Sequence, residues 1–187
     1  MPATDSKSAL GFARTQPARS TDQEELRPIL TQILEAKELD QVLLDLTRPI
    51  LTLFQAEKLI FYGVDAEKQE AFLRVPSLGE GHSLRCPLTE HNLSGLSCRQ
   101  QRVLNVRDVY NPAELTSLHP QLTHDSSWDK KTGFRTKQVL TCPILVDPTT
   151  PIGVLQIINK RGGMPFTSRD EELLSEIGKN LAAVNAA

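Results

Sequence analysis

The sequence predicts an α+β sandwich, in which a central antiparallel sheet of about six strands carries helices mainly on one face. The first observation is the order of the apolar patterns. Two segments of helical period open the chain, short β-rich runs fill its middle, and another helical segment ends it. The second is the length of the connections, because residues 65–68 and 147–151 are turns short enough to join antiparallel neighbours.

Helical segments are expected at both ends of the chain and once in the middle. The first helix should begin near Glu25, where Pro28 suits the first turn because its missing N–H costs nothing there. Its apolar residues recur at steps of three and four: Leu26, Ile29, Leu30, Ile33 and Leu34. Further helices are expected over 39–55, with a kink at Pro49, over 92–101 and over 169–184.

The expected strands are rich in β-branched and apolar residues. They cover 58–64, 70–75, 83–88, 102–106, 138–146 and 152–160. Between the fourth and fifth of these, residues 111–135 form an irregular stretch that contains the only tryptophan of the chain. A loop of that length inside a compact domain is usually functional or mobile, so we expect it to border a site.

Length and composition indicate one ordinary domain. Residues 1–22 are expected to be a flexible tail, because they show no apolar period, and 23–187 a single domain that includes both terminal helices. The net charge of −2 offers no basic field for nucleic acid. With no long apolar run and no secretory leader, membrane insertion is not expected. Cys86, Cys98 and Cys142 form no CxxC pair, which favours the reducing cytoplasm.

The end of the last strand carries an ordered motif. Asn159 and Lys160 end the strand, a glycine pair turns the chain, Phe166 plugs the edge of the core, and a helix follows. Ser168 and Glu171 have the spacing of a capping box, in which each side chain satisfies an amide of the other. Asp170 lies in the first helical turn, where a negative charge is favoured and where Lys160 can reach it. All of these roles are structural.

The same residues carry a family resemblance. Asn159, Lys160, Phe166, Asp170 and Glu171 resemble the NKFDE signature of the GAF domains of cyclic-nucleotide phosphodiesterases and related cyclases. Segments 129–136 and 140–144 are similar to the same family, and the resemblance covers roughly 39–184. It implies a GAF fold.

A narrower resemblance concerns segments 105–110 and 130–138. They are similar to GAF domains that precede the ATPase of type II secretion or type IV pilus assembly systems. The chain has no GxxxxGK[ST] loop, so it carries no ATPase of its own. The resemblance implies an effector or ATPase domain C-terminal to this one in a larger protein.

A ligand site is expected where the middle helix begins. Leu93, Ser94 and Gly95 open that helix, whose first N–H groups are free to bind a phosphate, and Gly95 would let a ligand approach the backbone. The resemblance implies the same place. An ordinary capping and packing role for Ser94 and Gly95 is the alternative.

The resemblance also implies the second wall of that site. It places Asp129, Thr132 and Thr136 in the wall, with Gln156 on the central strand. The alternative for Thr132 is a turn with Gly133. Three features depart from the family's binding pattern: Gln156 is an amide where binders can carry an acid, Ile60 is apolar where they can carry a hydroxyl, and 75–79 lacks an aromatic–acid pair.

Catalytic chemistry is not expected. His119 and His124 lie near Asp125 and Asp129, but their spacing matches no common metal site. No nucleophile has a base within reach, and no nucleophile elbow occurs. We therefore expect neither an enzyme nor a metal site, and no required cofactor.

Two functions remain open. The first is a regulatory small-molecule sensor, with a cyclic nucleotide as candidate ligand, that signals through its terminal helices as a cytoplasmic homodimer. In that dimer, the apolar stripe of the last helix would pair with the first helix of a second copy; the stripe consists of Leu173, Ile177, Leu181 and Val184. Alternatively, the stripe covers its own sheet. The second function is a ligand-free dimerisation or interaction module of a secretion or pilus assembly ATPase.

Overall fold

The computed structural model describes residues 20–74 and 85–186. The helices are α1 (Ser20–Glu35), α2 (Leu39–Phe54), α3 (Leu93–Gln100), α4 (Pro112–Leu118), α5 (Ser127–Thr132) and α6 (Ser168–Ala186). The strands are β1 (Ala56–Asp65), β2 (Glu70–Leu73), β3 (Arg85–Pro87), β4 (Leu104–Val106), β5 (Val139–Asp147) and β6 (Thr150–Lys160). The expected tail, apart from the start of α1, and segment 75–79 lie outside the described residues.

The six strands form one antiparallel sheet in the order β3-β2-β1-β6-β5-β4. Its centre is made by the long strands β1, β6 and β5, and Ile60 pairs with Gln156, which pairs in turn with Thr141. The two edge strands, β3 and β4, are three residues long each. The predicted α+β class and the antiparallel six-stranded sheet are confirmed.

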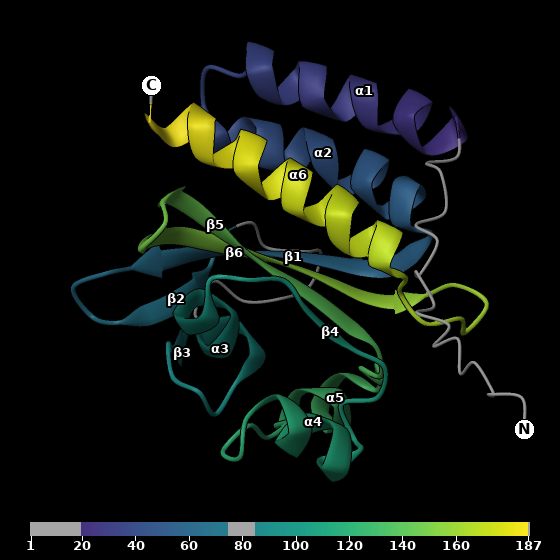
Figure 1. The fold of residues 1–187 in the computed structure, drawn as a ribbon, viewed down its shortest axis with the longest axis vertical. Coiled ribbons are helices and arrows are strands. Elements are labelled where there is room, and N and C mark those ends of the chain that lie inside the picture. The colour runs from purple at the N-terminus through teal and green to yellow at the C-terminus, as the bar shows by residue number, and fades with distance from the viewer. Residues whose placement is uncertain (1–19, 75–84, 187) are drawn as a thin grey trace, which may run out of the picture.

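Helices cover both faces of this sheet, and the long ones share a face (Figure 1). Helices α2 and α6 lie directly on the sheet, and α1 lies over the pair. The short helices α3, α4 and α5 lie on the opposite face. Because each long helix has an apolar stripe, stacking them on one side buries most of these stripes at once. Leu34, which was expected in the stripe of α1, is an exception, because it is 71% exposed.

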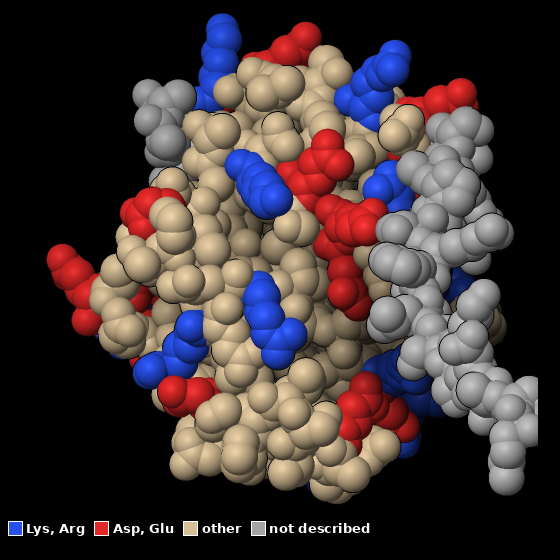
Figure 2. All heavy atoms as spheres, viewed as in Figure 1, with Lys and Arg blue, Asp and Glu red and all other residues tan. Residues whose placement is uncertain are grey.

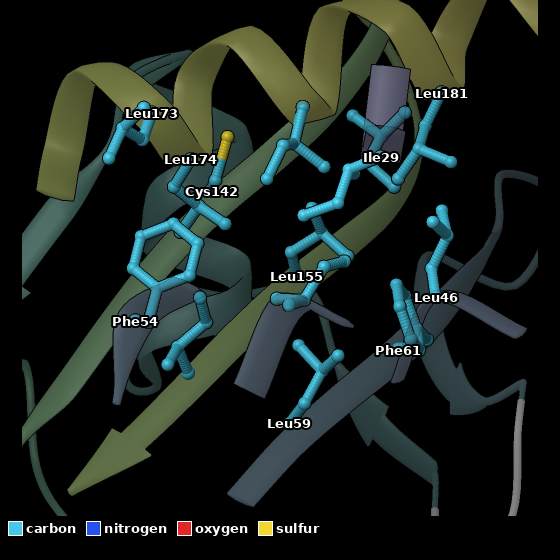
Figure 3. Packing of buried hydrophobic residues seen from close by; sticks show 14 of the residues in the cluster. Ile29, Leu46, Phe54, Leu59, Phe61, Cys142, Leu155, Leu173, Leu174 and Leu181 are labelled. Carbon is cyan, nitrogen blue, oxygen red and sulfur yellow. The ribbon is translucent and has the colours of Figure 1, made fainter. Parts of the chain in front are cut away.

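The main core lies between the sheet and the long helices (Figure 3). Phe54 from α2, Leu155 from β6 and Leu174 from α6 are each completely buried there. Leu173, Ile177 and Leu181 belong to the same cluster and are at most 2% exposed. The α6 stripe therefore covers its own sheet and packs with the chain's own α1, so the expected pairing of this stripe with a second copy is wrong.

The first helix starts earlier than its sequence indicates. It begins at Ser20 and not near Glu25, so Pro28 lies inside the helix. The start near Glu25 was predicted from Pro28, but a tertiary contact favours the longer helix: Asp22 in its first turn lies 3.7 Å from Arg169 at the start of α6. Helices α1 and α6 begin at the same end of the molecule and run in the same direction (Figure 1).

The expected irregular stretch 111–135 contains two short helices. Asn111 caps α4 by accepting hydrogen bonds from the amides of Ala113 and Glu114, and Pro112 occupies the first turn. Gly133 ends α5 in the left-handed conformation. Helices of seven and six residues are too short to show an apolar period, and only their caps could have revealed them.

Charges of both signs are interspersed over the face shown in Figure 2, without a continuous field of either sign there. No helix among the described residues is long and apolar enough to cross a bilayer.

Candidate functional site

Helix α3 begins at the centre of the face covered by the short helices. The Asn92 side chain caps it by accepting a 2.8 Å hydrogen bond from the Gly95 amide, and it donates a 2.7 Å bond to the Pro87 carbonyl. The amides of Leu93 and Ser94, the first two of the helix, have no acceptor among the described residues. Free N–H groups at the start of a helix are the groups that favour an anion, so the predicted anion site at this place stays a prediction.

A group of polar side chains lies beside these amides. Gln156 Nε2 donates a 3.0 Å hydrogen bond to Ser94 Oγ, which joins β6 to the start of α3. Thr141 is the neighbour of Gln156 across the strands and is fully buried, yet its hydroxyl has no partner among the described residues. Buried hydroxyls are normally hydrogen-bonded, so this one is an exception that calls for an explanation.

Sequence reasoning missed Thr141. It lies in an apolar strand that was assigned to the core, and a single threonine there gives no signal by itself. The only available clue was alternation: Val139 and Thr141 point to the face of α3, whereas Leu140 and Cys142 point to the long helices.

Gly95 has a packing role. A Cβ added at this position would lie 2.2 Å from the Thr89 carbonyl oxygen and 2.7 Å from the Leu88 carbonyl carbon. The backbone that precedes α3 fills this space, and the Gly95 amide is already bound by Asn92. The expectation that Gly95 makes room for a ligand is therefore wrong, because the glycine makes room for the chain itself.

Asp129 and Thr136 form a second polar group. Asp129 is 8% exposed, and its carboxylate accepts hydrogen bonds from the Tyr110 hydroxyl at 2.6 Å and from the amide and hydroxyl of Thr136, both at 2.8 Å. His124 Nε2 is buried 3.6 Å from the same carboxylate and has no hydrogen-bond partner among the described residues. The Arg135 guanidinium lies over the Tyr110 ring at 4.3 Å.

The hydrogen bonds around Asp129 stabilise the charged form of its carboxylate. Burial acts to raise the pKa of Asp129, but hydrogen bonds from Tyr110 and Thr136 outweigh it and hold that pKa below its ordinary 3.8. The same hydrogen bond raises the pKa of Tyr110. Asp129 is therefore an anion that the protein itself already solvates.

The structure thus brings together the predicted residues in two separate groups. Leu93, Ser94, Gly95 and Gln156 meet at α3, and Asp129 and Thr136 meet beside Tyr110; no hydrogen bond between described residues joins the two groups. Thr132 belongs to neither group. Its hydroxyl donates to the Trp128 carbonyl at 2.9 Å and accepts from the Phe134 amide at 3.2 Å, so it supports the turn at Gly133.

Asn159 holds the end of β6 against the start of β5. It adopts a left-handed conformation, with φ of 54°, which asparagine tolerates better than most residues. Its side-chain oxygen accepts from the amides of Lys137 and Gln138, and its nitrogen donates to the Arg135 carbonyl and to Glu57.

Lys160 and Asp170 close the strand–turn–helix unit, as expected. Lys160 Nζ lies 2.7 Å from Asp170 and 5.7 Å from the centre of the buried Phe166 ring. The capping box, however, is formed one residue earlier than predicted, by Thr167 and Asp170: the Asp170 amide donates to Thr167 Oγ1, and the Thr167 amide to Asp170. Ser168 is not the N-cap, because it is already the first residue of α6.

Glu171 is freed from capping and serves another contact. Its carboxylate accepts a 2.8 Å hydrogen bond from Asn105, whose amide also donates to the Phe166 carbonyl. Glu171 thereby fixes the edge strand β4 to the start of α6.

The cysteines are poorly disposed to react. Burial raises the pKa of Cys98 and of Cys142 to about 12, and burial together with Glu70 raises the pKa of Cys86. Within the described ranges, no group of three or more His, Cys, Asp or Glu side chains is placed to hold a metal ion.

An open hollow of about 490 Å³ lies at the corner between α1 and α2, on the side of the long helices. It is lined by polar and charged residues that include Glu35, Glu38 and Asp45. None of the predicted site residues contributes to it.

The chain is similar to known proteins in sequence and in fold. Residues 24–184 match the GAF domain family. A curated relative is a probable 3′,5′-cyclic phosphodiesterase, pde-5, of Caenorhabditis elegans, which is 23% identical over 145 residues. This match covers 72% of the chain but only 18% of the relative, so the chain spans less than a fifth of that protein.

Solved structures resemble the fold along nearly its whole length. The GAF domain of an Acinetobacter phosphoenolpyruvate-protein phosphotransferase superposes with a TM-score of 0.69 at 16% identity and covers 90% of this chain and 94% of its own. The free methionine-R-sulfoxide reductase of Neisseria meningitidis, solved with its substrate, gives 0.67 at 21% identity and covers 87% of each chain. At these identities the likeness shows the fold alone. The family match over residues 24–184, with which the six-stranded antiparallel sheet agrees, shows that the chain belongs to the GAF domain family, a family of regulatory domains that sense small molecules.

Proposed function

We propose that this domain binds a small anionic ligand at the start of α3 and that a cyclic nucleotide is the first candidate. The observation that carries the proposal is the buried Thr141 hydroxyl, which has no partner, beside two free helix amides and the Ser94–Gln156 pair. A ligand that hydrogen-bonds to Thr141 would remove the cost of burying it unpaired.

The two parts of a cyclic nucleotide would use different groups. Its single phosphate charge suits the amides of Leu93 and Ser94, which donate hydrogen bonds at the positive end of the helix dipole. Gln156 offers a base both a donor and an acceptor without imposing a charge. The distant phosphodiesterase relative supports a cyclic nucleotide as the ligand to test first.

A signal from this site would pass through β5 to α6. Thr141 faces α3, and its neighbour Cys142 faces α6, where a Cβ added at Gly178 would lie 3.0 Å from Cys142 Sγ. Because Gly178 lets α6 lie close to the Cys142 side chain, a shift of β5 at Thr141 would act on α6 at Gly178. The terminal helix would then carry the change to an effector domain in a longer protein. The raised pKa values of Cys98 and Cys142 disfavour cysteine-based catalysis, because they leave little thiolate.

The test is a thermal-shift titration with cAMP and cGMP. Saturation at a hundredfold excess over Kd should stabilise the fold by about 2.7 kcal/mol. Thr141→Val and Ser94→Ala should abolish the shift, whereas Thr52→Val, the same change at an exposed position of α2, should leave it intact. A shift that persists in both site variants would place the ligand elsewhere.

The rival function is a ligand-free interaction module, such as one attached to a secretion or pilus assembly ATPase. The specific observation in its favour is that Asp129 and Thr136 satisfy each other, so the second wall offers a ligand few free groups. If neither nucleotide changes the melting midpoint, this function is favoured.

A homodimer remains a proposal under either function. It would need surfaces other than the α6 stripe, such as the region around Leu34 and Leu44, which are 71% and 53% exposed. Light scattering over a range of concentrations tests it.

A further inference from the structure

The segment that links α5 to β5 carries an unusual concentration of cations. Lys130, Lys131, Arg135 and Lys137 fall within eight residues, all four are exposed, and none has an ion-pair partner within 4 Å among the described residues. Some cations elsewhere are paired, as Arg85 is with Glu70 and Arg99 with Glu90, whereas here four without a described ion-pair partner lie close together in the chain. On a chain of net charge −2, this local excess is a distinct feature.

Carboxylates around this segment have other partners, although the charge of Lys130 helps to lower the pKa of Asp125. Asp129 points inward to Tyr110 and Thr136. Asp125 accepts a hydrogen bond from the Ser127 amide at the start of α5, and Glu57 accepts one from Asn159. The charges of the four cations are therefore left to solvent or to a partner.

Two of the cations are held in place by aromatic rings. Lys131 Nζ lies 5.1 Å from the centre of the Trp128 ring, and the Arg135 guanidinium lies 4.3 Å from that of Tyr110. A side chain that is ordered before binding loses less conformational entropy when a partner binds. The segment is thus prepared for contact with an anion.

An exposed apolar side chain adjoins the cations. The loop after β6 is fixed to the same segment, because Gln138 Nε2 donates a 3.1 Å hydrogen bond to the Gly163 carbonyl and Asn159 binds the Arg135 carbonyl. The next residue, Met164, is 67% exposed. Methionine is an adaptable contact residue at binding surfaces.

We propose that Lys130, Lys131, Arg135, Lys137 and Met164 form a docking surface for an acidic polypeptide segment in which carboxylates flank an apolar side chain. The surface goes beyond the ligand site at α3, since it shares no residue with it. The planar guanidinium of Arg135 can donate two parallel hydrogen bonds to a carboxylate, and the lysines add positive charge around the apolar contact at Met164.

Other anionic partners fit less well. Single-stranded nucleic acid binds by stacking bases on free ring faces, but here the chain's own cations cover faces of Trp128 and Tyr110. An anionic membrane calls for an amphipathic face with several apolar anchors, and Met164 alone supplies one.

The test uses the intact chain and a fluorescent peptide in which glutamates flank two leucines, followed by fluorescence polarisation. Binding should weaken as salt is raised to about 0.3 M, because exposed charges are screened. Lys130→Ser/Lys131→Ser/Lys137→Ser should raise Kd about tenfold or more, and Met164→Ser should raise it by a smaller factor. Arg135 is kept, since it also covers Tyr110.

The matched control removes the same charge elsewhere. Arg27→Ser/Lys37→Ser/Arg48→Ser changes three exposed cations of α1, α2 and the link between them and should leave Kd unchanged. Equal weakening by both triple variants, or no measurable peptide binding by the wild type, would overturn the proposal. So would binding to phosphatidylserine vesicles or to single-stranded DNA that exceeds peptide binding and depends on the same lysines. An unchanged melting midpoint shows that each variant is folded.

Discussion

On the face covered by α1, α2 and α6, the buried side chains are apolar apart from Asp170 at the start of α6 and Gln138 just before β5, whereas the opposite face buries Ser94, Ser97, Thr141 and Asp129. The long helices present continuous stripes, so their face can be filled without polar groups. The start of the short helix α3 lies against β6, where Gln156 binds Ser94, and the polar groups of such an end need partners. One sheet thus carries an almost wholly apolar face and a face that holds most of the buried polar groups.

The largest effect should come from the apolar face. Phe54→Ala removes a completely buried ring and should lower the free energy of unfolding by about 3–5 kcal/mol. Leu115→Ala in the seven-residue α4 should cost less, because a short surface helix can relax into the space. Urea unfolding of both variants measures the difference, and equal losses would remove this contrast between the faces.

Replacing either of two glycines by alanine should destabilise the fold, and the cost should be larger at Gly95 than at Gly178. Gly95→Ala forces a methyl group against the Thr89 backbone and should cost about 1–3 kcal/mol. Gly178→Ala meets the Cys142 side chain at 3.0 Å, which can shift, so its cost should be lower. If Gly178→Ala is the more damaging in the same urea experiment, α6 is held more rigidly on β5 than the contact distances indicate.

The charge of Asp129 should make the recognition face sensitive to acid. Asp129→Asn should lower stability at neutral pH by on the order of 1 kcal/mol. Because the folded state lowers this pKa, the contribution of Asp129 is present above the ordinary value of 3.8 and is lost as pH falls through the lower folded value. The wild type and variant should therefore converge in strong acid, and a difference that grows on acidification would contradict the assignment.

The smallest expected effect is a gain in the free energy of unfolding, whereas the other substitutions lower it. Thr141→Val keeps the shape of the side chain but removes the unpartnered hydroxyl, so it should stabilise the free protein by about 0.5–1 kcal/mol. Thr52→Val provides the comparison at an exposed site. A clear destabilisation by Thr141→Val in thermal unfolding would mean that the hydroxyl has a partner in solution.

The sequence was sufficient to predict those helices and strands that carry a long periodic pattern of apolar residues. The stripe of α2 and the apolar strands β5 and β6 were predicted nearly to the residue, because long periodic segments bury one face in any packing. Helices α4 and α5 were missed because helices of seven and six residues are marked only by their caps. The start of α1 was misplaced because Asp22 is held by Arg169, which belongs to a helix far away in the sequence.

For the candidate site, the sequence predicted where some residues meet better than it predicted what each residue contacts. Ser94 and Gln156 were expected at one site, and the structure joins them by a hydrogen bond. Gly95, Asp129 and Thr136 were expected to face a ligand, but their partners are other parts of the chain that no local pattern reveals. The orphan hydroxyl of Thr141 could only be recognised once the neighbours on three strands were known.

The two short edge strands have a consequence for how copies of this protein meet. A long open edge would offer its unpaired N–H and C=O groups to any other extended chain and so invite fibrous assembly. Here β3 ends in Pro87, which donates no hydrogen bond, and carries the exposed Arg85, while β4 gives only three residues before the chain turns to α4. These short neighbours cover only part of the long strands, since β4 pairs with Val139, Leu140 and Thr141 of β5 and β2 pairs with residues 62–65 of β1. Within the described residues, the edges of the sheet are therefore blunted at β3 and β4 and stay open along the rest of β5, where a second extended chain would have to add.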